Sequence, residues 1–320
     1  MKQTTIEPQN AHQRIDKFMR KWLEEAPLSF IYKLFRKKEI KVNGKWVKPE
    51  YVLKQGDLVT VYLKEEQYAD FSVQRRLQPK KLPYNIIYED AHVLILQKPK
   101  GVLVQGEGKL SETTLTTEVQ AYMVYQGELT EHVMGSLPAP AHRLDRQTGG
   151  LIVYGKTVES LQAHQHIFKS HQLRKFYYAL VHGYVDKGGE LSYKLTKDSD
   201  KKMVYVAGED EEGMTAITRY DVVKHIQDFS LLNVEIITGR THQIRVHMKA
   251  FQHPVVGDQK YGDFQKNLAV KKTYGYEAMF LHAYAIVFPK LTGVLSGISE
   301  KKFTIELDEI DQGFLLKLNA

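Results

Sequence analysis

Ala141-His-Arg-Leu-Asp145-Arg-Gln-Thr-Gly-Gly150-Leu-Ile-Val-Tyr154 is the stretch around which this chain is organised. It places one carboxylate between two arginines, followed by two glycines and an apolar run. Because Arg143 and Arg146 flank Asp145, their charge favours the ionised carboxylate, which is a competent nucleophile. The glycines suit a tight loop that leads into a strand over Leu151–Tyr154. Taken alone, the pattern favours a surface ion pair over a nucleophile, and both interpretations stay open here.

The composition is that of an ordinary globular protein with a basic bias. Apolar residues make up 42% and charged residues 26% of the 320 residues, a length that suggests two domains. The sequence contains no cysteine, which excludes disulfides and thiolate metal sites. It shows no signal peptide and no membrane-spanning run, so we expect a cytoplasmic protein. The net charge of +7 favours a polyanionic partner such as nucleic acid.

Composition and hydrophobic period divide the chain into four segments. Residues 1–11 are polar and are predicted to be flexible. Residues 12–64 have the patterns of a small α/β module. Residues 65–83 mix charges with Gln and Pro without an apolar period, which is typical of a linker. Residues 84–320 are then the larger domain.

The small module is predicted to contain two helices, a hairpin and a further strand. Apolar residues at helical spacing predict a helix that begins at Arg14 and ends near Pro27. Ser29 is positioned to cap the second helix. Alternating residues around Asn43-Gly44 are a strong hairpin signal. The last strand is expected over Leu58–Leu63.

The small module also carries an uneven charge. Seven cations and a single acid, Glu39, lie between positions 33 and 48. The cations are Lys33, Arg36, Lys37, Lys38, Lys41, Lys45 and Lys48. Such a cluster either stays solvated or meets a polyanion, and the sequence pattern alone permits both.

The larger domain alternates strands with helices. Two strands around a polar turn are expected within residues 86–96, and an aromatic strand over residues 174–183. A charged hairpin excursion is expected on the surface over residues 186–215. The other elements are helices over 114–125 and 158–169 and strands near 216–224 and 229–237.

Thr238-Gly-Arg240-Thr-His242-Gln-Ile-Arg245-Val-His247 has two candidate chemistries. A helix that begins near Thr241 would place Thr241 and Arg245 on one face and offer its amino end to an anion. Arg240 and Arg245 suit bidentate pairing with carboxylate or phosphate. A metal site built from His242, His247 and His253 is disfavoured, because their spacing is not His-Glu-x-x-His and no acidic residue occurs between Glu235 and Asp258.

The order of these motifs resembles the RluA family of pseudouridine synthases. The resemblance rests on His142-Arg-Leu-Asp145, Lys175-x-Tyr177, the run from Thr238 to His247, and Pro254-x-x-Gly-Asp258-x-x-Tyr261-Gly. The segment before residue 65 resembles the S4 RNA-binding domain, through residues 13–18, Val42-Asn-Gly and Gly56-Asp. Within the family, the pieces Ser29–Lys37 and Lys48–Tyr51 are most similar to the RluC branch.

The resemblance implies an α+β fold and an activity. A catalytic domain on a mixed, largely antiparallel sheet with flanking helices would follow a small S4-like α/β domain. The implied reaction isomerises uridine in large-subunit ribosomal RNA without cofactor or metal, and no membrane or obligate protein partner is implied. Asp145 would be the nucleophile, Arg245 its ion-pair partner, and Tyr177 would stack on the uracil and assist loss of the C5 proton. Tyr178 is the alternative tyrosine, because neighbouring strand residues point to opposite faces. Attack at base C6 or at ribose C1′ stays open.

The resemblance also implies residues that contact RNA. Arg143 would fill the gap left by the flipped uridine. The other expected RNA contacts are His142, Arg146, Arg240, Thr241, His242 and the basic residues Lys33, Arg36, Lys37, Lys38, Lys41 and Lys45. The modified uridine and the oligomeric state are not encoded in a readable form.

One position departs from the family pattern. Gly149 stands where the family usually has Ser, which removes a hydroxyl and is expected to loosen the loop. A catalytically impaired RNA-binding or ribosome-assembly factor with the same fold is therefore the alternative function.

Overall fold

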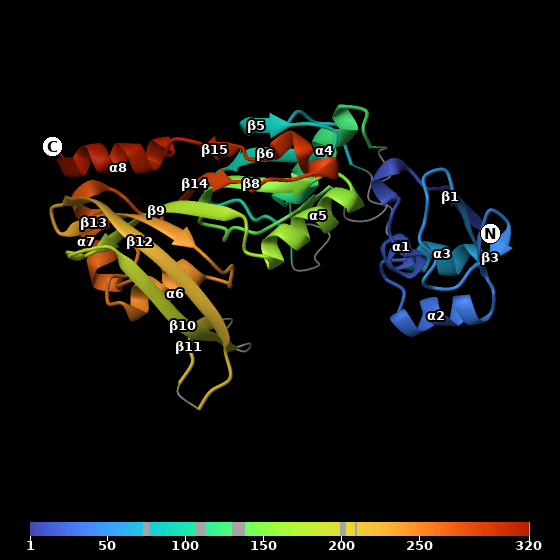
Figure 1. Cartoon of the computed structure of the whole chain (residues 1–320), viewed down its shortest axis with the longest axis horizontal. Helices are drawn as coiled ribbons and strands as arrows, with labels where there is room; N and C mark the ends of the chain where they lie inside the picture. The colour runs from blue at the N-terminus through green and yellow to red at the C-terminus, as the bar shows by residue number, and fades with distance from the viewer. Residues whose placement is uncertain (73–76, 107–112, 130–137, 199–202, 209, 320) are drawn as a thin grey trace. The chain divides into compact units, whose positions relative to one another are not determined.

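The computed structural model describes residues 1–72, 77–106, 113–129, 138–198, 203–208 and 210–319. The chain divides into two compact units (Figure 1). The first unit contains residues 1–94, 105–142 and 153–165, and the second contains residues 95–104, 143–152 and 166–320. None of the helices in the described ranges is long and apolar enough to cross a bilayer.

The N-terminal part of the first unit is a small α/β module with its own sheet. Within the described residues its four strands run in the order β1-β4-β2-β3. Its elements are β1 (Lys2–Thr5), η1 (Pro8–Asn10), α1 (Ile15–Trp22), α2 (Leu28–Arg36), β2 (Ile40–Val42), β3 (Lys45–Trp46), β4 (Leu58–Val61) and α3 (Glu65–Phe71). The β2–β3 hairpin turns at Asn43 and Gly44, whose φ angles of 50° and 79° confirm the predicted two-residue turn.

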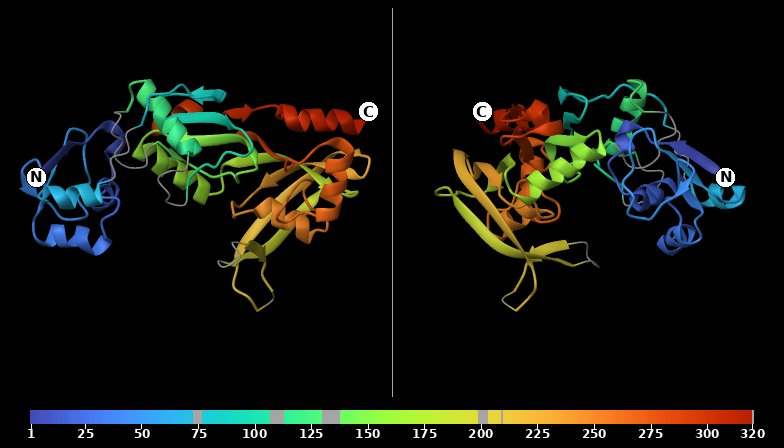
Figure 2. Two further views of the ribbon diagram at one scale, coloured as in Figure 1. Left: turned by 180° about the vertical axis from the view of Figure 1, so that it is seen from behind. Right: turned by 45° about the vertical axis from the view of Figure 1, so that its right-hand side comes forward.

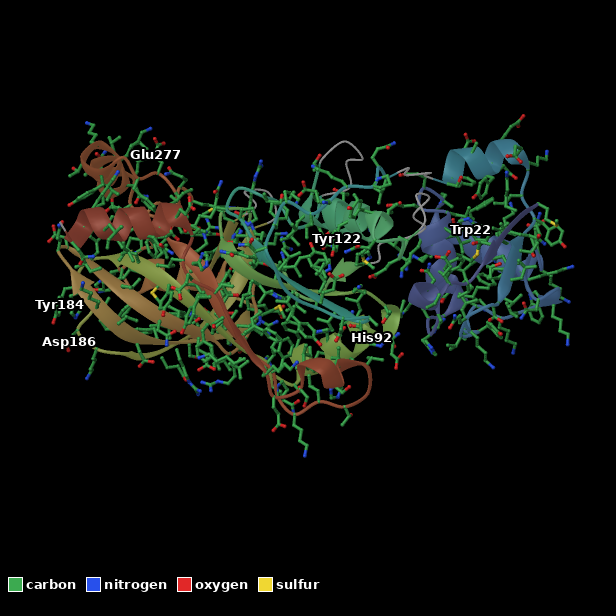
Figure 3. All side chains as sticks on the ribbon, turned by 90° about the horizontal axis from the view of Figure 1, so that it is seen from above. Trp22, His92, Tyr122, Tyr184, Asp186 and Glu277 are labelled. Carbon is green, nitrogen blue, oxygen red and sulfur yellow. The ribbon has the colours of Figure 1, made fainter. Side chains whose placement is uncertain are left out.

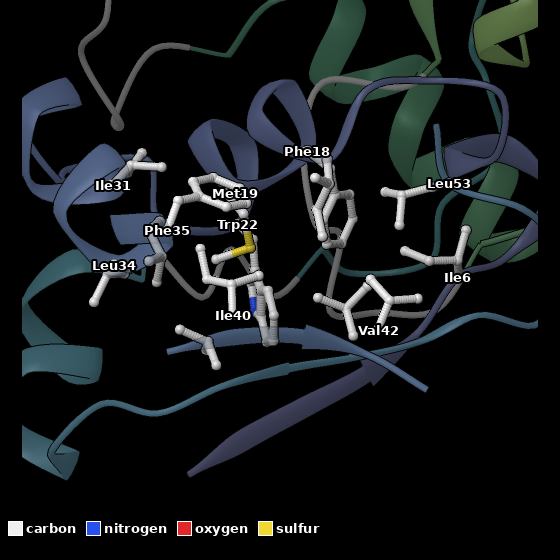
Figure 4. Packing of buried hydrophobic residues seen from close by; sticks show 14 of the residues in the cluster. Ile6, Phe18, Met19, Trp22, Ile31, Leu34, Phe35, Ile40, Val42 and Leu53 are labelled. Carbon is white, nitrogen blue, oxygen red and sulfur yellow. The ribbon is translucent and has the colours of Figure 1, made fainter. Parts of the chain in front are cut away.

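The module folds around an apolar core of its own (Figure 4). Phe18, Met19 and Trp22 of α1 are buried together with side chains of α2 and β2. Their spacing matches the predicted helical period, although α1 ends at Trp22 and does not extend to Pro27. Trp22, labelled in Figure 3, donates its indole N–H to the Tyr68 hydroxyl at 3.1 Å.

Three local expectations for this region are wrong. Residues 1–11 are not loosely held, because β1 pairs antiparallel with β4 and Ile6 is 1% exposed. The expected linker begins with helix α3, whose Tyr68 and Phe71 pack against the module core. Ser29 does not cap α2, which begins at Leu28 and lacks a side-chain cap. In the first two cases contacts from distant parts of the chain provide what the local pattern lacked.

The rest of the described chain contains a larger sheet of eleven strands, most of which belong to the second unit (Figure 2). Its main path is β11-β10-β12-β13-β9-β14-β8-β6-β5, with β15 on β14 and β7 on β8. The strands are β5 (Ile86–Glu89), β6 (Val93–Lys98), β7 (Ala139–Pro140), β8 (Gly149–Gly155), β9 (Arg174–His182), β10 (Gly189–Asp198), β11 (Met203–Val206), β12 (Met214–Ile226), β13 (Phe229–Ile236), β14 (Leu281–Val287) and β15 (Lys302–Thr304).

The sheet is mixed, as expected. The strands from β10 through β12, β13 and β9 to β14 are antiparallel neighbours, and β14 pairs with β8 in parallel. The remaining elements are α4 (Leu115–Tyr125), α5 (Val158–Lys169), α6 (Gln243–Ala250), α7 (Phe264–Tyr274), η2 (Gly293–Ile298) and α8 (Glu309–Asn319). The predicted helices over 114–125 and 158–169 are confirmed by α4 and α5. The surface hairpin expected within 186–215 is formed by the antiparallel strands β10 and β11, and residues 199–202 between them lie outside the described chain.

Side-chain and packing contacts hold the helices of each unit in place. In the first unit, Tyr122 of α4, labelled in Figure 3, donates to Glu89 Oε2 at 2.9 Å. The same Glu89 carboxylate accepts from the buried Lys156 ammonium at 3.0 Å. In the second unit, α6 packs over β10, β11 and β12. This packing fixes the helix that carries Arg245.

Candidate active site

Asp145 lies in a tight turn immediately before strand β8. The Thr148 N–H donates to the Asp145 carbonyl at 3.1 Å, so Asp145 and Thr148 close a four-residue turn. The Asp145 side chain remains 18% exposed. The turn therefore presents the carboxylate at the start of a buried strand.

Gly150 sets the close approach of β8 to β14. Its φ is +121°, a backbone conformation that side chains disfavour. A Cβ atom built on Gly150 would lie 2.3 Å from the Ala283 carbonyl oxygen. Gly150 and Ala283 are partners in the parallel pairing of the two strands. The glycine therefore allows the sheet to form directly beside the Asp145 turn.

Arg245 connects Asp145 to a second carboxylate. Its Nη1 donates to Asp145 Oδ2 at 2.7 Å, across a separation of one hundred residues. Its Nε and Nη2 donate to Asp258 Oδ2 at 2.7 Å and Asp258 Oδ1 at 2.8 Å, which is a bidentate pair. Two of the three donors thus orient the guanidinium, and the third is directed at Asp145.

The electrostatics of this triad keep its charges in place. Burial alone would lower the pKa of Arg245, but Asp258 and Asp145 more than offset that effect and raise it. Burial would raise the pKa of Asp258, yet the Arg245 hydrogen bonds and charge lower it. The backbone N–H groups of Lys260 and Tyr261 also donate to Asp258. Arg245 and Asp258 therefore remain an ion pair next to Asp145.

Tyr177 of strand β9 lies within the field of Asp145. Burial, followed by the Asp145 charge, raises the pKa of Tyr177 above its ordinary value. Tyr178 belongs to the other face of β9, where its ring stacks on Tyr284 with centroids 4.0 Å apart. The register of β9 therefore separates the two tyrosines that the sequence left open.

The loop before α6 differs from the expected helix start. The helix begins at Gln243, after His242 in the left-handed conformation with φ of 53°. Gln243 anchors the loop, because its amide donates to the Ile217 carbonyl and the Thr218 hydroxyl of β12. Thr241 is exposed and lies outside the helix, so the prediction that it shares a helical face with Arg245 is wrong.

His242 and Arg240 have separate surroundings in this loop. The His242 Nε2 atom lies 3.8 Å from Asp145 Oδ1, and its Nδ1 atom lies 2.8 Å from the Tyr261 hydroxyl. Arg240 Nε donates to the Thr215 carbonyl at 3.1 Å. Arg240 is thus half-buried against β12, whereas His242 joins the carboxylate site.

Lys98 is a site residue to which the sequence assigned no role. It is 1% exposed, and its ammonium donates to the carbonyls of Pro99, Val102 and Arg146. Burial lowers the pKa of Lys98 to about 7, partly opposed by the Asp145 charge. By binding the Arg146 carbonyl, Lys98 fixes the residue that follows Asp145.

Asp258 and Tyr261 were also missed as individual residues. Both belong to the motif from Pro254 to Gly262, so the signal was present as a pattern without an assigned chemistry. The available clue was Asp258 itself, an acidic residue of this motif that follows Arg245 by thirteen residues.

The expected RNA contacts do not all gather at Asp145. Arg143 and Arg146 are exposed, and Arg146 donates to the Gly101 carbonyl at 2.9 Å. His142 belongs to the first unit, where its Nε2 accepts from the Val153 N–H at 3.2 Å. In the N-terminal module, Lys41 is half-buried, and the other five predicted basic contacts are exposed: Lys33, Arg36, Lys37, Lys38 and Lys45.

The three histidines considered as metal ligands do not form a cluster. Among the described residues, the group with metal-ligand spacing is His282, Asp308 and Asp311. The Lys100 ammonium lies 3.7 Å from Asp308 and also bonds Asp311. Tyr276 donates to Asp311 at 2.6 Å. We therefore interpret this group as a buried ion-pair network.

Gly149 faces this network and is not in a loop. It is the first residue of the fully buried strand β8, which corrects the expectation of a loosened loop. A Cβ at Gly149 would lie 3.3 Å from His282 Nδ1 and 3.4 Å from Asp308 Oδ2. The missing hydroxyl therefore concerns the His282–Asp308 contact and leaves the Asp145–Arg245 bond intact.

Comparison with known proteins identifies relatives along nearly the whole chain. Residues 92–250 match the RNA pseudouridylate synthase family. The chain is 35% identical to the ribosomal large subunit pseudouridine synthase C of Vibrio cholerae, over 94% of this chain and 90% of the relative. It is 34% identical to the protein of that name from Escherichia coli K12, over 90% and 88% of the two chains.

Solved structures show the same fold. The human RNA pseudouridylate synthase domain containing 4 superimposes with a TM-score of 0.58 at 22% identity, covering 73% of this chain and 93% of that chain. The human RNA pseudouridylate synthase domain containing 1 gives a TM-score of 0.51 at 22% identity, covering 76% and 98% of the two chains.

Proposed function

This chain belongs to the RluA family of RNA pseudouridine synthases, and on that premise we propose that it isomerises uridine to pseudouridine in large-subunit ribosomal RNA. The named substrate of its bacterial relatives, identical to it at 34–36% over about nine-tenths of the chain, supports this choice of RNA. A ribosomal RNA substrate also favours a cytoplasmic location.

The observation that carries the proposal is the bond from Arg245 to Asp145. Isomerisation breaks the N1 glycosidic bond, turns the base, joins C5 to the ribose carbon and releases the C5 proton. Oxidation states are unchanged, so a carboxylate nucleophile is sufficient chemistry. Because Arg245 is itself oriented by Asp258, it fixes the direction of the Asp145 carboxylate.

Tyr177 is proposed to stack on the uracil as a neutral phenol. The raised pKa of Tyr177 disfavours a phenolate at neutral pH, so unaided removal of the C5 proton by this side chain is unfavourable. An apolar ring face beside the nucleophile nevertheless suits a flipped base. The action of the Asp145 charge on the Tyr177 side chain supports this role.

The RNA is proposed to be held by Arg143 and by the basic residues of the small N-terminal module. Arg143 is exposed two residues before Asp145 and is the candidate for filling the gap left by the flipped uridine. We assign the N-terminal module as S4-like, which is supported by two helices followed by a hairpin with exposed cations. Its phosphate contacts would contribute affinity with little sequence preference.

Mapping of pseudouridine in a deletion strain tests the proposal. Large-subunit RNA would be mapped in the strain alone and after complementation with the wild-type gene, Asp145→Asn or Asp145→Glu. We expect one or more sites to disappear on deletion and to return with wild type only. A matched control, Asp186→Asn, changes an exposed acid of the same unit and should restore every site.

The outcomes separate the two functions considered for this chain. Failure of the wild-type gene to restore any site would leave a non-catalytic RNA-binding factor as the explanation. Restoration by Asp145→Asn would instead retain the enzyme and remove Asp145 as its nucleophile.

A further inference from the structure

Asp145 has a second neighbour besides Arg245, on its other carboxylate oxygen. Arg245 Nη1 bonds Oδ2 at 2.7 Å, whereas His242 Nε2 lies 3.8 Å from Oδ1. The two side chains come from the same short segment, three residues apart, and approach different oxygens. The carboxylate is therefore bracketed by one permanent cation and one imidazole.

The imidazole is held from behind by Tyr261. The Tyr261 hydroxyl lies 2.8 Å from His242 Nδ1 and accepts a hydrogen bond from the Val204 N–H at 3.0 Å. Since that hydroxyl already accepts from Val204, its own proton is available for Nδ1. When the Tyr261 hydroxyl donates to Nδ1, a neutral His242 carries its proton on Nε2, the nitrogen directed at Asp145.

The backbone and the surrounding charges restrict His242 further. Its left-handed φ of 53° is uncommon for a residue other than glycine, and Gln243 ties the next residue to β12. The charged groups that act on the ring are Asp145 and Asp258, which favour its protonation, and Arg245 and Lys260, which oppose it. Burial outweighs the carboxylates, so the ring is neutral at neutral pH.

We propose that His242 is a positioning residue that donates from Nε2 to Asp145 Oδ1 when RNA occupies the site. The 3.8 Å separation must shorten by about 1 Å to reach hydrogen-bond length. A neutral donor orients the attacking carboxylate without adding a second cation, which would reduce its nucleophilicity. The proton remains on Nε2 throughout. This inference rests on the proposed function and replaces the expected direct contact of His242 with RNA.

Three variants of the full-length chain test the proposal. His242→Gln retains an N–H donor near Asp145, His242→Phe fills the space without one, and Tyr261→Phe removes the hydroxyl that sets the tautomer. Release of tritium from unmodified large-subunit RNA labelled with [5-³H]uridine measures the single-turnover rate of the reaction on bound RNA. Filter binding measures Kd for the same RNA. His225→Phe is the matched control, because it replaces a histidine whose ring stacks on Tyr184.

We expect the single-turnover rate to fall on the order of tenfold to a hundredfold in His242→Phe and by a smaller factor in Tyr261→Phe, with Kd within about twofold of wild type. His242→Gln should recover most of the rate. Equal rates for His242→Phe and wild type, or equal losses in the Phe and Gln variants, would overturn the proposal. A weakened Kd with an unchanged rate would restore the RNA-contact interpretation. Inactive wild-type protein would refute the proposed function instead, so the two failures are distinguishable.

Discussion

Arg245 forms a bidentate ion pair with Asp258 through two parallel hydrogen bonds of 2.7 and 2.8 Å. The Asp258 side chain has no exposed surface, and Arg245 is 10% exposed. Because two of its donors are bonded to Asp258, the planar guanidinium has a fixed orientation, and its Nη1 points at Asp145. The geometry of the proposed nucleophile therefore depends on a second carboxylate, Asp258, which contacts it only through Arg245.

Asp258→Asn should damage both stability and activity. The amide preserves shape but removes the charge that compensates Arg245, and breaking a buried ion pair costs about 3 kcal/mol. Urea unfolding would measure that loss, and tritium release should slow on the order of tenfold or more because Arg245 loses its orientation. Glu190→Gln is the control, since it breaks the exposed Arg219–Glu190 pair and should cost below about 1 kcal/mol. Similar costs for the two variants would contradict this argument.

Substitution should strongly destabilise the protein at Gly150 and be tolerated at the adjacent Gly149. Gly150→Ala places a Cβ 2.3 Å from the Ala283 carbonyl at a positive φ, so we expect a loss of about 3 kcal/mol or failure to fold. Gly149→Ser meets its nearest neighbours at 3.3 Å, within reach of His282 and Asp308, and should be tolerated with activity retained. Thermal unfolding of both proteins gives the comparison. A severe loss in Gly149→Ser would show that the network beneath it cannot yield.

Buried His247 should make the protein less stable in acid. It is 0% exposed, and burial lowers its pKa to about 4, whereas the unfolded value is about 6.5. Between these values the unfolded chain binds the extra proton, so stability is lost as pH falls from 6.5 towards 4. At pH 5 the effect is at most about 2 kcal/mol. His247→Phe, which keeps a ring against Tyr193, should lose less stability between pH 7 and pH 5 in urea unfolding. Identical pH dependence in both proteins would rule out this contribution.

Neutralising the basic module should weaken RNA binding in a salt-dependent way. Replacement of Lys37, Lys38 and Lys41 by Gln removes three cations, and each lost phosphate contact should flatten the plot of log K against log salt by about one. Lys38 and Lys41 also lie over the rings of Trp46 and Tyr62, at 5.4 and 5.1 Å, which orients their side chains. Lys187→Gln, an exposed lysine of the other unit, is the control. An unchanged slope in the triple variant would exclude the module from phosphate binding.

Local elements of this protein were predictable because their signals are local. The hairpin at Asn43-Gly44, the helices α4 and α5 and the strand β9 follow from turn chemistry and hydrophobic period over short windows. The sequence order of motifs also determined the family and the choice of Asp145, Tyr177 and Arg245. The predicted domain boundaries stay predictions.

Tertiary contacts decided what local patterns could not. Strand β1 exists because β4 pairs with it, and α6 begins after His242 because Gln243 is anchored to β12. The sequence could not distinguish Tyr177 from its neighbour Tyr178. In the structure the Asp145 charge acts on Tyr177, whereas the ring of Tyr178 stacks on Tyr284.

The sequence by itself therefore determined several local elements, among them the hairpin at Asn43-Gly44 and helices α4 and α5, and which carboxylate to suspect. Periodicity and motif order are properties of neighbouring residues. The tertiary structure showed the expected bond from Arg245 to Asp145 across one hundred residues, and it alone decided that Asp258 orients Arg245 and that Gly149 faces His282. The physical reason is that hydrogen bonds and packing act over a few ångströms in space, irrespective of separation along the chain.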